Sequence, residues 1–114
     1  MKKTRPRVRW MVTINGLPAR ETTLHIPSIG RWPHVFVLCE LPPVDATTWA
    51  GKHGKRDARR AAERTRRFNR YVRGKTALAG DWFLRGASPR LAIFVSPVTV
   101  DIAPVSTLTP AETT

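Results

Sequence analysis

The residues that could do chemistry are mainly arginines and lysines, and most of them fall in one segment. From Lys52 to Lys75 the chain carries eleven basic residues and two acids, Asp57 and Glu63, so this segment has a formal charge of +9. The whole chain of 114 residues carries +12. Guanidinium groups donate paired hydrogen bonds to phosphate oxygens and stay charged at any physiological pH. The segment therefore predicts binding to a polyanion, of which nucleic acid is the commonest.

The spacing of the small and apolar residues in this segment is typical of one helix face. They recur three and four residues apart, at Ala58, Ala61, Ala62, Thr65, Phe68, Asn69 and Val72. The opposite side carries Arg56, Arg59, Arg60, Arg67 and Arg70, and its flanks carry Arg64, Arg66 and Arg73. The pattern predicts a helix over 56–73 that ends at Gly74, since glycine commonly terminates helices. We expect its alanine side to pack on a sheet and its arginines to face solvent.

Other basic residues, at the N-terminus of the chain and near the start of the predicted helix, extend the predicted binding surface. Residues 1–7 contain several cations and no acid, which predicts a basic N-terminal arm. Lys52 and Lys55 lie where the helix is expected to begin. The predicted nucleic-acid-binding residues are Lys2, Lys3, Arg5, Trp49, Lys52, Lys55, Arg56, Arg59, Arg60, Arg64, Arg67 and Arg70. We expect them to contact the phosphate backbone of DNA or RNA without a cofactor.

Aromatic side chains could add stacking on bases to these phosphate contacts. Trp32 and Trp49 fall in predicted loops, beside Arg31 and Lys52, and are the better candidates. Most other aromatic residues lie in apolar runs and are expected in the core, namely Trp10, Phe36 and Phe94.

The stretch Ala61-Ala62-Glu63-Arg64-Thr65-Arg66-Arg67 resembles the basic region of bZIP factors, in which an alanine pair precedes basic residues. The resemblance covers this stretch alone. Ala58 stands where that family has its base-reading asparagine, and no leucine heptads follow Val72. It implies a helix with one small-residue face and one arginine face, and not a bZIP dimer.

Gly51-Lys52-His53-Gly54 is similar to the GxxG loop of KH domains, which clamps a nucleic-acid backbone. The resemblance implies close approach of a phosphate to Lys52 at a helix N-terminus. The following helix has arginines where KH domains have isoleucines, so a flexible loop with incidental basic residues is the other interpretation.

Before the helix, the sequence predicts three strands. Val8 to Ile14 has the two-residue period of a half-buried strand, and Asn15-Gly16 predicts a turn. A second strand is expected at 21–26. The apolar run 34–41 predicts the central strand of a sheet, covered on both faces.

After the helix, 82–85 and 91–95 predict a hairpin, and a further strand is expected from Val98. The order β-β-β-α-β-β predicts an α+β fold, with a mostly antiparallel sheet and one long basic amphipathic helix. The same order occurs in OB-fold barrels, so the prediction includes an OB-like partial barrel. We expect one domain over 8–103 and a disordered tail over 104–114, where Thr and Pro dominate without periodicity.

Catalytic and metal-binding chemistry finds little support in the sequence. His25, His34 and His53 share no ligand spacing, and the single cysteine cannot build a zinc cluster. We predict no catalytic site and no metal. One apolar-flanked cysteine and no stretch long enough to span a bilayer predict a cytoplasmic protein that does not enter membranes.

Two other functions stay open on sequence grounds. Residues 78–85 and 90–95 resemble the late strands of RelE-type toxins, which implies a metal-independent ribonuclease that cuts messenger RNA. The chain departs from that family at its start, where strands replace helices, and it has no terminal Arg-His pair. The other interpretation is an interaction module or inhibitor whose basic face docks on an acidic protein, or a homodimer.

Overall fold

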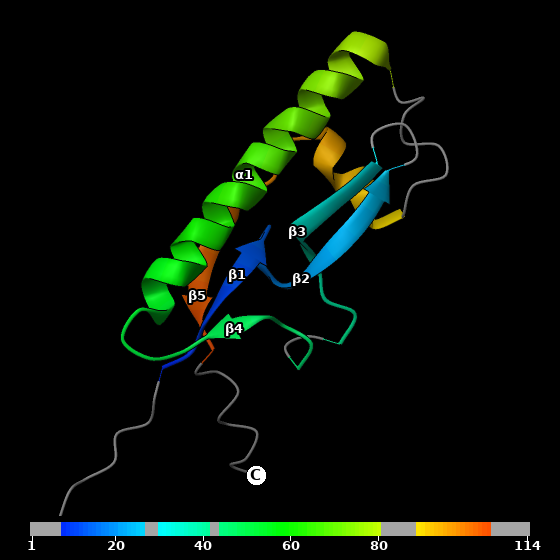
Figure 1. The fold of residues 1–114 in the computed structure, drawn as a ribbon. Helices are drawn as coiled ribbons and strands as arrows, with labels where there is room; N and C mark the ends of the chain where they lie inside the picture. The colour runs from blue at the N-terminus through cyan, green and yellow to red at the C-terminus, as the bar shows by residue number, and fades with distance from the viewer. Residues whose placement is uncertain (1–7, 27–29, 42–43, 81–88, 106–114) are drawn as a thin grey trace, which may run out of the picture.

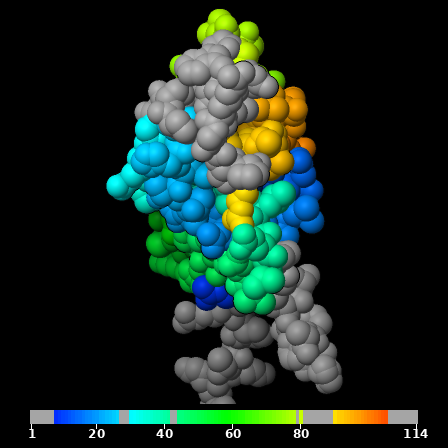
Figure 2. Space-filling model, turned by 90° about the vertical axis from the view of Figure 1, so that its right-hand side faces the viewer, coloured from blue at the N-terminus to red at the C-terminus, as the bar shows by residue number. Residues whose placement is uncertain are grey.

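The computed structural model describes residues 8–26, 30–41, 44–80 and 89–105. The elements in chain order are β1 (Trp10–Ile14), β2 (Leu17–Ile26), β3 (Gly30–Leu38), β4 (Thr48–Trp49), α1 (Gly54–Ala79), the 3-10 helix η2 (Pro89–Val95) and β5 (Val100–Pro104). The long helix α1 lies across one face of the sheet (Figure 1). Figure 2 shows a different side, on which β2 and η2 form much of the surface.

β1 lies at the centre of an antiparallel sheet. It pairs with β5 over its full length, from Trp10 opposite Pro104 to Ile14 opposite Val100. It also pairs with β2 near its C-terminal end and with β4 near its N-terminal end. β2 continues past β1 and pairs with β3. The predicted α+β class with a mostly antiparallel sheet is confirmed, and the sheet is open, so it is not a full barrel.

β3 lies at the edge of the described sheet, so its predicted central position is wrong. It pairs with β2 alone. Its apolar residues are nevertheless buried on both faces, because Val35 lies opposite α1 while Phe36 packs against Trp49, with ring centroids 5.8 Å apart. An unbroken apolar run thus indicates that both faces of a strand are buried. It does not indicate how many strands pair with it.

The order of strands also differs from the prediction in the described part of the chain. Four strands precede the helix and one follows it, instead of three and two. The additional strand, β4, is only two residues long and has no periodicity to reveal it. The predicted strand at 91–95 is wrong, because this segment belongs to η2. Its predicted hairpin partner, 82–85, lies outside the described residues, as do residues 81–85 of the stretches that resemble RelE-type toxins.

η2 forms because its apolar residues fit a helical turn against α1. Leu91 and Phe94, three positions apart, are both buried, and the Phe94 ring meets the Phe68 ring edge-on at 5.1 Å. The alternation of apolar residues at 91, 93 and 95 is equally compatible with a strand, so periodicity alone could not decide. The contact of Phe94 with Phe68 of α1 favours the 3-10 helix.

The predicted helix is confirmed, and its buried stripe is the one expected from the spacing. Ala58, Ala61, Ala62, Thr65, Phe68, Asn69 and Val72 are all buried. Small residues form the N-terminal part of this stripe and larger ones the C-terminal part. The alanines let the N-terminal part of the helix lie close to the strands, whereas Phe68 and Val72 need more room. Aromatic rings border the space between α1 and β3, namely Trp32 of β3 and Phe68 and Tyr71 of α1.

The helix is longer than predicted, from Gly54 to Ala79, and Gly74 lies inside it. The chain leaves the helix at Gly80 instead, which has φ 75° and whose amide donates to the carbonyl of Thr76 at 2.8 Å. A glycine inside a helix costs only about 1 kcal/mol relative to alanine. The good helix formers that follow, such as Lys75, Ala77 and Leu78, outweigh this cost.

We expect Gly74→Ala to stabilise the protein by about 0.5–1 kcal/mol, because alanine restricts the unfolded chain and favours the helix. A Cβ at this exposed position meets nothing within 4 Å. Gly54→Ala is the matched control with the opposite sign, since its Cβ would lie 2.9 Å from the carbonyl oxygen of Trp49. Urea unfolding of the two variants measures both changes, and a destabilised Gly74 variant would contradict the assignment of Gly74 to the helix.

The folded part of the chain reaches beyond the predicted domain boundary at 103. β5 includes Pro104, and Val105 is buried with its amide donating to the carbonyl of Arg9 at 2.8 Å. The rest of the predicted tail, 106–114, lies outside the described residues. In the parts of the chain that are described, no helix combines the length and the apolar character needed to cross a bilayer.

Candidate nucleic-acid interface

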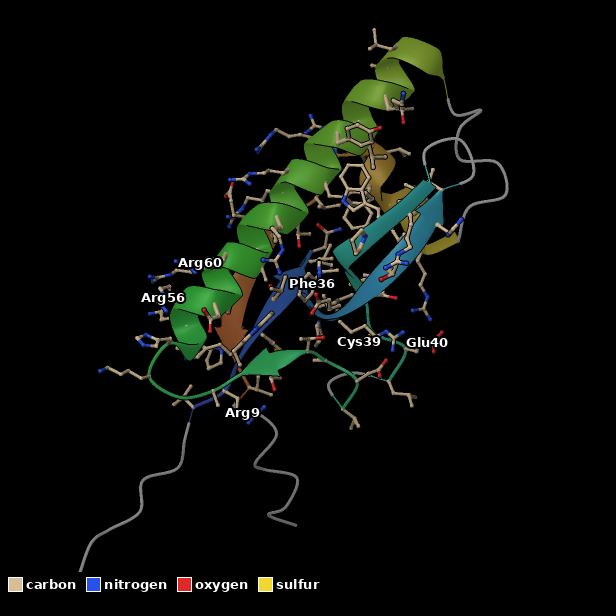
Figure 3. All side chains as sticks on the ribbon, in the orientation of Figure 1. Arg9, Phe36, Cys39, Glu40, Arg56 and Arg60 are labelled. Carbon is tan, nitrogen blue, oxygen red and sulfur yellow. The ribbon has the colours of Figure 1, made fainter. Side chains whose placement is uncertain are left out.

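Six arginines of α1 form an exposed row, which we call the arginine ridge. Its members are Arg56, Arg59, Arg60, Arg64, Arg67 and Arg70, all exposed. Most of them lie on the helix face opposite the buried stripe, and Arg64 lies on the flank that borders β3. Figure 3 shows Arg56 and Arg60 pointing away from the sheet.

Only one acidic side chain contacts the ridge among the described residues, and several arginines share it. The carboxylate of Glu63 lies 3.2 Å from Arg66, 3.8 Å from Arg67 and 3.8 Å from Arg70. These pairs are about half exposed, and such pairs contribute little because water and salt screen them. One carboxylate cannot neutralise three guanidinium groups.

The remaining ridge arginines keep their hydrogen-bonding groups available. Arg56, Arg59, Arg60 and Arg64 have no hydrogen bond or ion pair with any other described residue. Each presents several N–H donors and a full charge to solvent. The ridge is therefore a cationic surface, and four of its arginines use none of their donors within the described part of the chain.

The predicted lysines lie near the start of the helix. Lys52 is exposed in the turn before α1, and Lys55 is exposed in the first turn, with its ammonium 4.9 Å from the ring centroid of Trp10. The stretch 51–54, which is similar to a GxxG loop, leads directly into the helix, since α1 begins at Gly54. Lys2, Lys3 and Arg5 lie outside the described residues.

Trp49 lies in a strand, so the predicted loop position is wrong. Its half-buried ring packs against Phe36 in the core. Phe36 and Phe94 are fully buried, as predicted for core residues, and Trp10 is half buried. Trp32 also lies in a strand, β3, but at a place where its ring reaches a hollow beside the ridge.

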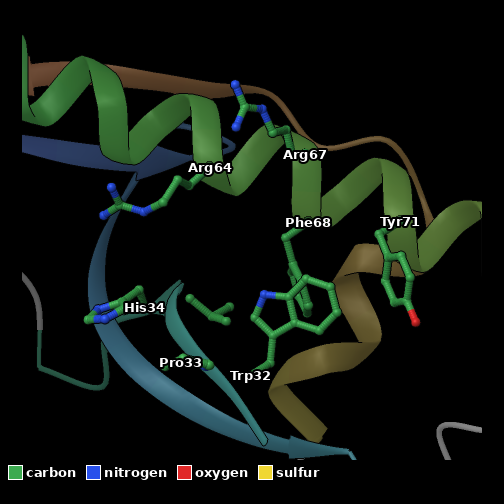
Figure 4. Close-up of a pocket in the computed structure, with 8 residues that line it drawn as sticks. Trp32, Pro33, His34, Arg64, Arg67, Phe68 and Tyr71 are labelled. Atoms are coloured by element: carbon green, nitrogen blue, oxygen red, sulfur yellow. The ribbon is translucent and has the colours of Figure 1, made fainter. Parts of the chain in front are cut away.

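This hollow, which we call the β3–α1 pocket, has a volume of about 340 Å³ and opens to solvent. Residues 32–35 of β3 form one wall, and Arg64, Arg67, Phe68 and Tyr71 of α1 form the other (Figure 4). The Trp32 ring contacts the Phe68 ring edge-on at 5.2 Å and the tilted Tyr71 ring at 4.7 Å. Two ridge arginines thus border an aromatic pocket.

His34 at one side of this pocket has an unusual backbone conformation. Its φ of 60° lies in the left-handed region, which non-glycine residues rarely adopt. Its exposed ring contacts the carboxylate Oε2 of Glu21 through Nδ1, at 2.5 Å. His34 lies at the irregularity of the β2–β3 pairing, where the register shifts between Thr22 and Leu24, so its positive φ belongs to a β-bulge.

Sequence reasoning missed His34 and Tyr71 as site residues. Tyr71 follows Arg64 and Arg67 by seven and four positions, so the three share one flank of the helix. That signal was present in the sequence. The approach of β3 to this flank was not, because it depends on how the sheet packs against the helix.

The pKa of the Cys39 thiol argues against its use as a nucleophile. Burial, followed by the nearby charge of Asp45, raises the pKa of the Cys39 thiol, which therefore stays protonated at neutral pH. A protonated thiol is a poor nucleophile. Among the residues with described positions, no group of three His, Cys, Asp or Glu side chains could hold a metal ion.

Comparisons with protein-family models, with curated proteins and with solved structures gave no match, so the function of this chain has to be argued from the ridge and the pocket themselves.

Proposed function

We propose that this protein binds nucleic acid through its phosphate backbone, with the arginine ridge as the principal contact surface. The observation that supports this most is the set of four exposed arginines without an ion-pair partner in the described structure, all on one helix. A charge of +12 on a small chain destabilises the fold by self-repulsion, so a polyanionic partner is the simplest reason for it.

The dimensions of the ridge suit a phosphate backbone. From Arg56 to Arg70 the helix rises about 21 Å, at about 1.5 Å per residue. This length corresponds to roughly six phosphates at about 3.4 Å per nucleotide of one strand. Each guanidinium can contact one phosphate with two parallel hydrogen bonds. The contacts carry no base identity, so binding by the ridge is expected to be largely independent of sequence.

A salt titration tests this proposal. We expect the wild-type protein to bind a fluorescein-labelled oligonucleotide, with log K falling linearly against log salt concentration at a slope of about −4 for a single strand. Each neutralised phosphate releases condensed counterions, so the slope counts the contacts. Fluorescence anisotropy measures the affinity at each salt concentration. No binding to single strands or duplexes at low salt would contradict the proposal and favour an acidic protein as the partner.

A further inference from the structure

The β3–α1 pocket lies directly beside the arginine ridge and shares two residues with it. Arg64 and Arg67 belong to the ridge and also line the pocket. Figure 4 shows Arg64 on the pocket side of the helix, toward His34, whereas the guanidinium of Arg67 points away from the ring of Trp32. A backbone bound along the ridge would therefore pass the pocket entrance, within reach of any group attached to it.

The lining of the pocket combines an aromatic surface with hydrogen-bond donors. Trp32, Phe68 and Tyr71 supply the rings. The indole N–H of Trp32 has no hydrogen-bond partner among the described residues, and Figure 4 shows this nitrogen turned toward the side where His34 and Arg64 lie. Arg64 likewise has no partner there. A ligand that satisfies these groups needs a flat ring, hydrogen-bond acceptors and a negative charge.

We propose that the β3–α1 pocket binds one unpaired nucleotide of a single-stranded nucleic acid, with its base beside Trp32 and its phosphate on Arg64. This inference rests on the proposed backbone binding by the ridge. The volume of about 340 Å³ is at the lower end of the range for small-molecule pockets. A base in a duplex is stacked and paired, so it cannot enter without being unpaired first.

The pocket therefore gives the protein a preference for single strands that the ridge alone lacks. A ridge of guanidinium groups binds any phosphate backbone, and duplexes offer the higher charge density. Aromatic contact with an unpaired base adds affinity that only a single strand can obtain. His34, whose ring contacts the carboxylate of Glu21, lines one side of the pocket.

The test compares a DNA strand of about twelve nucleotides with the same strand annealed to its complement, in fluorescence anisotropy at one salt concentration. We expect the wild-type protein to bind the single strand about tenfold more tightly. Trp32→Phe should reduce this ratio toward one, because it removes the indole that lies beside the base. Arg64→Gln should reduce it as well, because in the single strand Arg64 holds the phosphate of the nucleotide whose base enters the pocket. Arg59→Gln is the matched control, since it removes the same charge from the other flank of the ridge. It should lower the affinity for both ligands and leave the ratio of the two affinities unchanged.

Three results would overturn the inference. The first is equal wild-type affinity for strand and duplex, which would leave the ridge proposal intact. The second is an equal change of the ratio in the Arg59 and Arg64 variants. The third is binding of a free mononucleotide as tight as that of the strand, which would indicate a small-molecule pocket. Failure of both DNA forms to bind at low salt would instead contradict the proposed function itself.

Discussion

Replacing Arg56, Arg59 and Arg60 together with glutamine should lower the affinity for a single-stranded oligonucleotide about a hundredfold at about 0.1 M salt. Loss of three phosphate contacts removes about two units from the slope of log K against log salt concentration. These three arginines have no ion pair to lose within the described structure, so the effect is on the ligand. Glutamine retains helix propensity, and α1 should stay folded. Fluorescence anisotropy at several salt concentrations measures both quantities.

Two further variants make this result specific to the ridge. Arg31→Gln removes one exposed charge from β3 and should weaken binding only slightly. Glu63→Gln removes the carboxylate shared by Arg66, Arg67 and Arg70 and should strengthen binding severalfold. Circular dichroism verifies that each variant keeps its helix. The decrease in log K is compared between the variants. If the decrease in the triple variant were no more than three times that in Arg31→Gln, net charge and not the ridge would explain binding.

The ridge and the helix that presents it could be predicted from the sequence because both are local properties. One buried stripe from Ala58 to Val72 repeats with a helical period, and the charges fall on the positions it leaves over. The spacing of residues within a helix fixes which of them face the same way. The position of the helix end was less predictable, since Gly74 is compatible with both a stop and a continuing helix.

The pocket could not be predicted because it joins residues far apart in the chain. Trp32 and Arg64 are separated by the β3–α1 connection, and only the packing of α1 on the sheet brings their walls together. Sequence reasoning placed Trp32 in a loop, although its stacking potential was noted. The segment 91–95 shows the same limit, since its apolar pattern suits a strand or a 3-10 helix and a contact with α1 decides.

The placement of the ridge depends on a polar contact that holds the underside of α1 to the rest of the fold. The side-chain amide of Asn69 is buried and donates to the carbonyls of Phe94 and Ser96, both at 2.9 Å. Its Oδ1 accepts from the amide of Val98 at 3.1 Å. This one side chain satisfies one backbone group of η2 and two of the segment that joins η2 to β5. Asn69 thus joins the helix to the irregular chain that leads into the sheet.

Asn69→Leu should destabilise the protein by about 3–4 kcal/mol, because it leaves these backbone groups without partners in a largely buried place. Urea unfolding followed by circular dichroism measures the change. Thr65→Val is the matched control, since Thr65 is equally buried on the same face but donates only to the carbonyl of Ala61, which the helix already bonds. It should cost less than about 1 kcal/mol. Equal losses in the two variants would show that the Asn69 contacts do not hold α1, and with it the ridge, in place.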